Sequence, residues 1–121
     1  MAMSSSNPID VVFRFRVKPG KQEQYQKAID YILPITEAKE PYVLEYNIYN
    51  NIEGVFTQHE RYADEAALHR HMELTAQGQQ DWAEAIELED VVVLGEMSDK
   101  FWSLYGGPHA HGFQEFRRVA R

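Results

Sequence analysis

An α+β fold of β-α-β-β-α-β order is predicted by the succession of two hydrophobic periodicities in the 121-residue sequence. Segments in which apolar and polar residues alternate are typical of strands, and segments with apolar residues three and four positions apart are typical of amphipathic helices. Turn-forming Gly, Pro and Asn residues separate these segments. Within residues 10–105 their order matches the ferredoxin-like pattern, in which two helices cover one face of a four-stranded antiparallel sheet.

The first half of the chain predicts a strand, a helix and a hairpin. Residues 10–18 form the first strand, because an apolar face alternates with a basic one, and a Pro-Gly pair ends it. In the following helix Pro34 lacks a backbone donor, so we expect regular helix to end near Leu33. Residues 42–50 and 55–62 are rich in aromatic and β-branched side chains, and the Asn- and Gly-containing turn between them predicts an antiparallel hairpin.

The second half predicts a helix and a fourth strand. Asp64 is a suitable N-cap for a helix that Gly78 is expected to break. Helix can resume over residues 79–89, and the apolar run that starts at Val91 predicts a strand buried on both faces. Residues 98–106 have a cap, aromatic residues at helical spacing and a closing glycine, which predict a short helix.

The length predicts one domain at residues 10–105, preceded by a flexible leader at 1–9. Residues 106–121 have no clear period and are expected to be a tail, either flexible or docked on a partner subunit. The net charge of −7 disfavours a nucleic-acid partner. No membrane helix or secretory signal is expected, so the cytoplasm is the expected location. The chain has no cysteine, which excludes disulfides and thiolate chemistry.

A homodimer is expected because apolar residues occur on both faces of the predicted strands. The two helices can cover only one of these faces. A second copy of the same sheet is the simplest cover for the other face.

Three stretches of the sequence carry a family resemblance: VVFRFRVKPGKQEQY, YVLEYNIY and HERYADEAALHRHM. They resemble the antibiotic biosynthesis monooxygenase family of dimeric α/β barrels. That family has a strand ending in Lys-Pro-Gly-Lys, a strand around a tyrosine, and Glu-Arg-Trp leading to Ala-Leu and a histidine. The matching positions in this sequence are 18–21, Tyr46, 60–62, 67–68 and His71.

The resemblance implies a pocket between the helices and the sheet and, in several members, cofactor-free oxygenation of quinols or anthrones. Other members of the wider superfamily degrade haem, isomerise small sugars or lactones, or have no known activity. Two positions depart from the pattern. Tyr62 replaces the frequent tryptophan, and Asp81 stands where the haem-degrading branch has a histidine, which disfavours haem ligation.

His71 and Glu60 are the candidate catalytic residues. His71 lies on the apolar stripe of its helix and can transfer a proton near neutral pH, whereas His69 lies about 200° around the helix and is expected to face solvent. The alternative for His71 is a buried, hydrogen-bonded histidine. Glu60 is a candidate general base in an apolar cleft. Its alternative is a cross-strand ion pair with Arg14 or Arg16.

Five further side chains are candidates for substrate binding. Tyr46, Tyr62, Trp82 and Trp102 can stack on a flat aromatic substrate, and Gln58 can donate a hydrogen bond to its oxygen atoms. Aromatic residues at interior spacing can equally be core.

No metal site is expected from the five histidines. The visible pair, His109 and His111, lies in a Gly- and Pro-flanked segment without a carboxylate nearby in sequence.

Two functional hypotheses follow. The first is a monooxygenase that needs no metal or flavin and uses molecular oxygen on a quinol or polyketide-like aromatic. The second is a small-molecule-binding or stress-associated barrel without turnover, or an isomerase that uses the same pocket.

Overall fold

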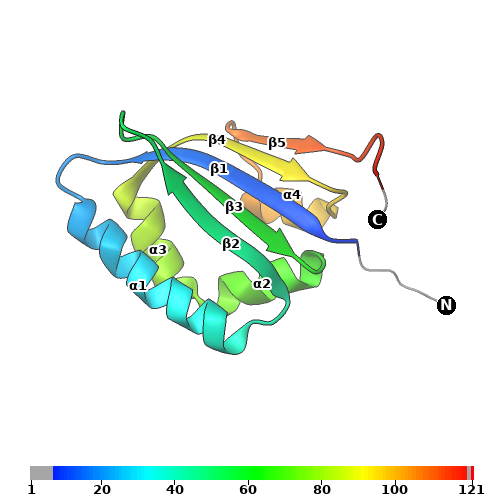
Figure 1. Ribbon diagram of the computed structural model, residues 1–121, viewed down its shortest axis with the longest axis horizontal. Coiled ribbons are helices and arrows are strands. Elements are labelled where there is room, and N and C mark those ends of the chain that lie inside the picture. Colours follow the sequence, from blue (N-terminus) through cyan, green and yellow to red (C-terminus); the bar gives the residue numbers. More distant parts are fainter. Residues whose placement is uncertain (1–6, 120) are drawn as a thin grey trace.

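In the computed structural model, which describes residues 7–119 and 121, five strands form one sheet in the order β2-β3-β1-β4-β5. All neighbouring strands are antiparallel except β4 and β5. The strands are β1 (Ile9–Val17), β2 (Val43–Asn50), β3 (Phe56–Tyr62), β4 (Ile86–Leu94) and β5 (Ala110–Phe113). The helices are α1 (Gln22–Lys39), α2 (Glu65–Leu74), α3 (Ala76–Ala85) and α4 (Asp99–Tyr105). They lie on the same side of the sheet, and no helix of the described part covers the other side, which we call the bare face (Figure 1).

The α+β, ferredoxin-like prediction is confirmed, but the sheet has a fifth strand. Ala110–Phe113 pair in parallel with Val91–Leu94 of the same chain, within the segment that was expected to be a flexible or docked tail. A short strand that contains glycine shows no alternation in sequence, because its position is fixed by backbone pairing and not by a buried face. At the other end, Ile9 already belongs to β1 and is buried, so the predicted leader is shorter than nine residues. Its residues 1–6 lie outside the described part.

α1 does not end at Leu33. The helix continues through Pro34 to Lys39. Pro34 is exposed and the carbonyl that loses its partner belongs to Asp30, which is also exposed, so water can replace the missing hydrogen bond. The extra turn matters because it brings Thr36 and Glu40 to the interior.

Gly78 is inside α3, and the helix break that was predicted there occurs at Thr75. α3 crosses α1 closely at this glycine. A Cβ atom at position 78 would lie 2.6 Å from Cγ1 of Ile32 and 2.9 Å from Cδ1 of Tyr31. The glycine therefore serves helix packing.

β4 begins at Ile86, earlier than predicted, and the preceding helix ends at Ala85. Residues 86–88, which were expected to be helical, pair with the second half of β1, and Glu89 lies at a register shift. Ile86 packs in an aromatic cluster with Phe15 and Tyr25. The tertiary contacts of this strand outweigh the helical preference of its Glu and Leu residues.

The core has two apolar parts, separated along β3 by buried polar residues. One part contains Ile9, Val11, Tyr62 and Leu68, and the other contains the aromatic cluster around Phe15. None of the helices in the described part has the length and apolar character needed to span a bilayer.

Replacing Gly78 with Val is expected to destabilise the protein by about 1–3 kcal/mol, because the added atoms overpack the α1–α3 contact. The free energy of unfolding from urea denaturation measures the effect. Gly107→Val is the control, since no atom lies within 4 Å of a Cβ at that position. Equal stability of the two variants would contradict the close crossing.

Candidate functional site

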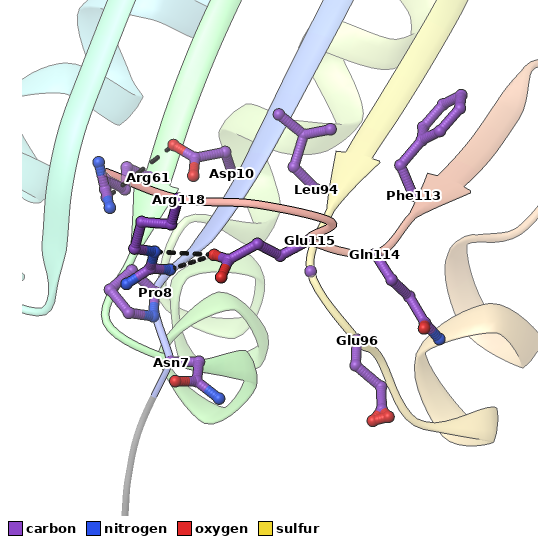
Figure 2. A pocket seen from close by; sticks show the side chains of 11 residues that line it. Asn7, Pro8, Asp10, Arg61, Leu94, Glu96, Phe113, Gln114, Glu115 and Arg118 are labelled. Atoms are coloured by element: carbon purple, nitrogen blue, oxygen red, sulfur yellow. Dashed lines mark hydrogen bonds and ion pairs between the residues drawn. The ribbon is translucent and has the colours of Figure 1, made fainter. Parts of the chain in front are cut away.

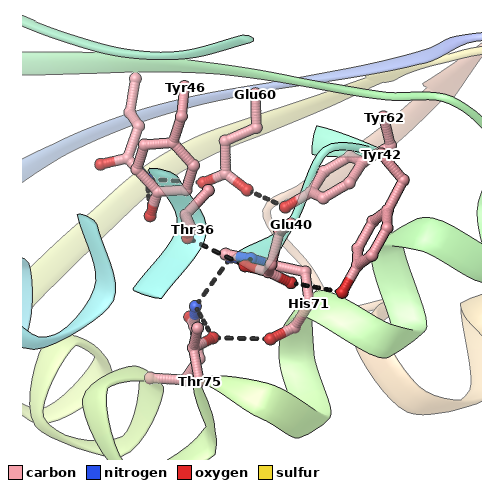
Figure 3. A network of polar contacts seen from close by, with 10 residues as sticks. Thr36, Glu40, Tyr42, Tyr46, Glu60, Tyr62, His71 and Thr75 are labelled. Atoms are coloured by element: carbon pink, nitrogen blue, oxygen red, sulfur yellow. Dashed lines mark hydrogen bonds and ion pairs between the residues drawn. The ribbon is translucent and has the colours of Figure 1, made fainter. Parts of the chain in front are cut away.

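A cluster of buried polar side chains lies between β2, β3 and the ends of α1 and α2 (Figure 3). Because side chains alternate along a strand, the positions of β3 that carry Gln58, Glu60 and Tyr62 all face the helices and are buried. The cluster consists of Thr36, Glu40, Tyr42, Tyr46, Gln58, Glu60, Tyr62, His71, Thr75 and Gln79. It joins groups from five elements at the place where the sequence predicted the site.

Glu60 is the centre of the half of the cluster that lies on the sheet. Gln58 Nε2 donates to one carboxylate oxygen at 2.5 Å, and the Tyr62 hydroxyl donates to the other. Gln58 Nε2 also donates to the Tyr46 hydroxyl at 3.1 Å. Neutral donors thus replace the water that a carboxylate loses on burial.

The predicted alternative for Glu60, an ion pair with Arg14 or Arg16, is wrong. These arginines project from the opposite face of the sheet. Their Nε atoms lie 3.3 and 3.2 Å from the carboxylate of Glu89 on β4. The neighbouring strand was predicted correctly, because β1 pairs with β3. Alternation within each strand, however, does not show which faces of two strands lie on the same side of the sheet.

His71 is the centre of the second half of the cluster. It is fully buried, and its Nδ1 lies 2.8 Å from Oε1 of Glu40. Its ring centroid is 5.6 Å from the ring of Tyr46 and 5.6 Å from the ring of Tyr62. The imidazole therefore lies between the carboxylate at the end of α1 and the tyrosine rings of the sheet.

Glu40 was missed by the sequence interpretation. It caps the C-terminal end of α1, and its carboxylate accepts hydrogen bonds from the hydroxyls of Thr36 and Tyr42, each at 2.9 Å. The expected helix end at Leu33 placed Glu40 in a loose turn. The helical i, i+4 spacing of Thr36 and Glu40 was the available signal.

Burial keeps the phenols of the site protonated. Burial first, and then the charge of Glu60, raise the pKa of Tyr46 and the pKa of Tyr62 well above the usual tyrosine value. Burial raises the pKa of Tyr25 on α1 to about 12. At neutral pH these three hydroxyls are therefore neutral hydrogen-bond donors.

The two tryptophans do not join His71. Trp82 packs in T-shaped contacts on Phe13 and Phe15, each with centroids 5.3 Å apart, in the aromatic part of the core. Trp102 packs on Phe101 of α4 and under Gly112 of β5, where a Cβ would lie 2.6 Å from Cζ2 of the indole. The helical spacing of Trp102 predicted a buried face but not which element covers it.

His69 is not a solvent-facing side chain. Its Nε2 lies 2.8 Å from the carboxylate of Glu65 on α2, and its ring lies 5.9 Å from that of Tyr105 on α4. Glu65 in turn accepts hydrogen bonds from the backbone and hydroxyl of Ser98, the N-cap of α4. His69 and Glu65 therefore attach α4 to α2.

Three buried polar atoms have no hydrogen-bond partner among the residues that the structure describes: Gln58 Oε1, Tyr25 Oη and Trp82 Nε1. Tyr25 and Trp82 both pack on Phe15, and Gln58 is paired with Phe13 in the β1–β3 register. The unpartnered atoms thus lie under neighbouring positions of the sheet. Buried polar groups of this kind normally have a partner, such as water or a ligand.

Two pockets in the described part of the chain lie away from His71. The first, of about 540 Å³, is formed by the start of β1, the end of β4 and the C-terminal segment (Figure 2). Arg61 and Arg118 reach it, together with Asp10 and Glu115. The second is a shallow depression on the outer surface of α1. Neither of these two pockets is lined by His71, which is fully buried.

The described residues contain no group of three or more His, Asp or Glu side chains that could hold a metal ion. Of the histidine pair that the sequence singled out, His111 is in β5, and its Nε2 lies 3.4 Å from the carboxylate of Asp90.

The fold and the site define a class of protein: a small α+β protein with a cluster of buried polar side chains beneath β3. The family model described as antibiotic biosynthesis monooxygenase matches residues 8–85. The chain belongs to this family, as the resemblance in its sequence indicated.

Solved structures extend the likeness beyond the family match. MupZ from Pseudomonas fluorescens is 18% identical, with a TM-score of 0.77 and coverage of 95% of both chains. A conserved protein from Methanosarcina mazei is 22% identical, with a TM-score of 0.61 over 73% of this chain and 91% of its own. SnoaB, a cofactor-independent oxygenase from Streptomyces nogalater, is 10% identical, with a TM-score of 0.60 over 75% of this chain and 94% of its own.

At these identities the likeness shows the fold. The match to MupZ covers 95% of this chain, so the few residues outside it cannot include both α4 and β5. No curated protein sequence matches the chain.

The attachment of α4 through Glu65 is expected to weaken in acid. Burial raises the pKa of Glu65, but the hydrogen bonds from Ser98 and the charge of His69 outweigh it and lower the pKa below its ordinary value. A lowered pKa in the folded state stabilises the protein above the unfolded-state pKa, and this contribution is lost as the pH falls through the folded value. Unfolding free energies of the wild type and Glu65→Gln should therefore differ at neutral pH and converge below about pH 4.

Glu37→Gln is the control for this experiment, because Glu37 is exposed on α1. A difference between the wild type and Glu65→Gln that does not change between pH 7 and pH 3 would contradict the role of the Glu65 charge.

Proposed function

We propose that the protein is a cofactor-independent monooxygenase that oxygenates a quinol or polyketide-like aromatic with molecular oxygen. Family membership supports the reaction class. SnoaB, which shares the fold, is described as a cofactor-independent oxygenase. The observation that carries the proposal is the buried cluster of His71, Glu60 and tyrosine hydroxyls beside three unpartnered polar atoms.

An electron-rich aromatic can supply all the electrons of such a reaction. His71 removes the proton of a phenolic hydroxyl, and the resulting phenolate reduces oxygen. One oxygen atom enters the ring system, and the other leaves as water with two hydrogen atoms of the substrate. A CH₂ group thereby becomes a carbonyl group, or a quinol becomes a hydroxyquinone. Either change is a four-electron oxidation, so no external reductant is needed.

The remaining polar groups orient the ring and stabilise the phenolate in this proposal. Tyr46 is protonated, so it can donate to a substrate oxygen, and Gln58 Oε1 can accept from a second hydroxyl. Glu60 holds Gln58 and Tyr62 in place and is the second candidate base. Trp82 contributes a ring face and an indole N–H. Trp102 has no role here, because it packs under β5.

Substrate binding requires the helices to move, because His71 is fully buried and a substrate cannot reach it from solvent. Displacement of α2 or α3 is the smallest such change, since both are short helices joined at Thr75. Closure of these helices over the substrate then excludes water from the phenolate.

The burial of the cluster also favours a second candidate function. A protein of this family without turnover, acting in small-molecule binding or in stress, needs the same cluster only as a hydrogen-bonded core. The full burial of His71 is what favours this alternative.

Measuring oxygen consumption with a panel of quinols and anthrones distinguishes the oxygenase from the protein without turnover. Substitution of His71 by Asn keeps a donor for Glu40 but removes the second ring nitrogen, so we expect the rate to fall about 10²–10⁴-fold. His109→Asn, at an exposed position, is the control and should retain the wild-type rate. Flat traces for the wild type across the panel, or an unchanged rate in His71→Asn, would overturn the oxygenase.

A homodimer in the cytoplasm remains our proposal for the assembly. Val12 and Val92 are paired on the bare face of the sheet and are only half-buried, so a second sheet can cover them. Sedimentation at micromolar concentration should give the mass of two chains, and Val12→Lys should shift it toward one. A wild-type monomer under these conditions excludes the dimer.

A further inference from the structure

The Glu40 carboxylate can only accept hydrogen bonds, and this determines which nitrogen of His71 carries the hydrogen. The carboxylate is fully buried, and no Lys or Arg pairs with it in the described part of the chain. The hydroxyl of Thr36 donates to Oε1 and that of Tyr42 to Oε2. The third contact, His71 Nδ1 at 2.8 Å from Oε1, then requires a donor as well, because a carboxylate only accepts.

The opposite ring nitrogen is consequently the basic one. Nε2 of His71 lies 3.3 Å from the side-chain nitrogen of Gln79, which can only donate. The same amide nitrogen donates to Thr75 Oγ1 at 3.1 Å, and the Thr75 hydroxyl donates to the His71 carbonyl at 2.6 Å. Each contact in this series therefore pairs one donor with one acceptor, and Nε2 of His71 is the acceptor whose lone pair points at Gln79.

Gln79 is the exposed end of this chain of contacts. His71 and the Glu40 carboxylate are fully buried, whereas Gln79 in the first turn of α3 is only half-buried. Its contact with Nε2 is long for a hydrogen bond, and a neutral amide gains little from it. A phenolic hydroxyl is a stronger donor than an amide, so it can take the place of Gln79 at Nε2.

We propose that Glu40 is a positioning residue that fixes the Nδ1–H form of His71, and that Gln79 occupies the place at Nε2 which the acidic hydroxyl of the substrate takes. This inference rests on the proposed oxygenase function and deepens it. The substrate O–H bond breaks and an Nε2–H bond forms. The ring becomes an imidazolium that the Glu40 carboxylate stabilises through Nδ1, and the substrate leaves this step as the phenolate.

The ring form of His71 can be tested without any substrate. Nitrogen NMR of protein labelled at histidine, with His71→Asn to assign the signal, should show hydrogen on Nδ1 and none on Nε2 at neutral pH. Hydrogen on Nε2 instead would overturn the proposal and leave the oxygenase function untouched. Because this measurement needs no turnover, a failure to find a substrate does not affect it.

Glu40→Gln tests the positioning role in the active enzyme, with Glu37→Gln on the exposed side of α1 as control. A neutral amide keeps the shape of the site but does not stabilise the imidazolium. We expect a fall in kcat of about 10–10²-fold and a shift of the acid limb of the pH–rate profile to lower pH. A lower melting temperature with an unchanged pH profile would show that Glu40 is only structural.

Gln79→Ala tests the access route, with the neighbouring exposed Gln80→Ala as control. Diethyl pyrocarbonate acylates accessible neutral imidazoles, and mass spectrometry of the peptide that contains His71 reads out its labelling separately from that of the other histidines. In Gln79→Ala we expect labelling of His71 about tenfold faster than in the wild type, since exposure limits the reaction of a buried group. An unchanged labelling rate would overturn the placement of the substrate at Gln79.

Discussion

Two buried carboxylates that pair with no Lys or Arg among the described residues are the constraint on which this structure depends. Removing a carboxylate from water costs several kcal/mol unless donors replace its hydration. Here the donors are neutral: Gln58 and a phenol for Glu60, and two hydroxyls and an imidazole for Glu40. The residue types at the end of α1, on β3 and on α2 follow from this requirement. Loss of any one donor leaves a carboxylate under-satisfied.

The fold and the polar cluster are therefore interdependent. α1 must continue past Pro34 to bring Glu40 to the imidazole, and the chain must break at Thr75 so that Gln79 can turn back toward it. The close crossing at Gly78 sets the distance between α1 and α3, and so the distance between the two residues that flank His71. Packing of the helices thus controls the geometry of a hydrogen-bond chain.

Local periodicity was sufficient to predict the first four strands, the helix faces and half of the cluster, because alternation on β3 and helical spacing on α2 decide which side chains point inward. It failed where a contact depends on elements far apart in sequence. Glu40 was missed because one proline was given too much weight, and Trp102 was misplaced because spacing does not reveal a covering strand. β5 was missed for a related reason, since its parallel pairing with β4 depends on the whole fold.

β5 also changes the chemistry of a sheet edge. Val91–Leu94 is a continuous apolar run, and without β5 its backbone donors and acceptors would form an open template for pairing with another chain. The strand that covers it is short, contains Gly112 and is held from beneath by Trp102, so it offers little length for further pairing. The C-terminal extension thus protects the protein from edge-to-edge aggregation. A chain that ended after α4 would keep its core and lose this protection.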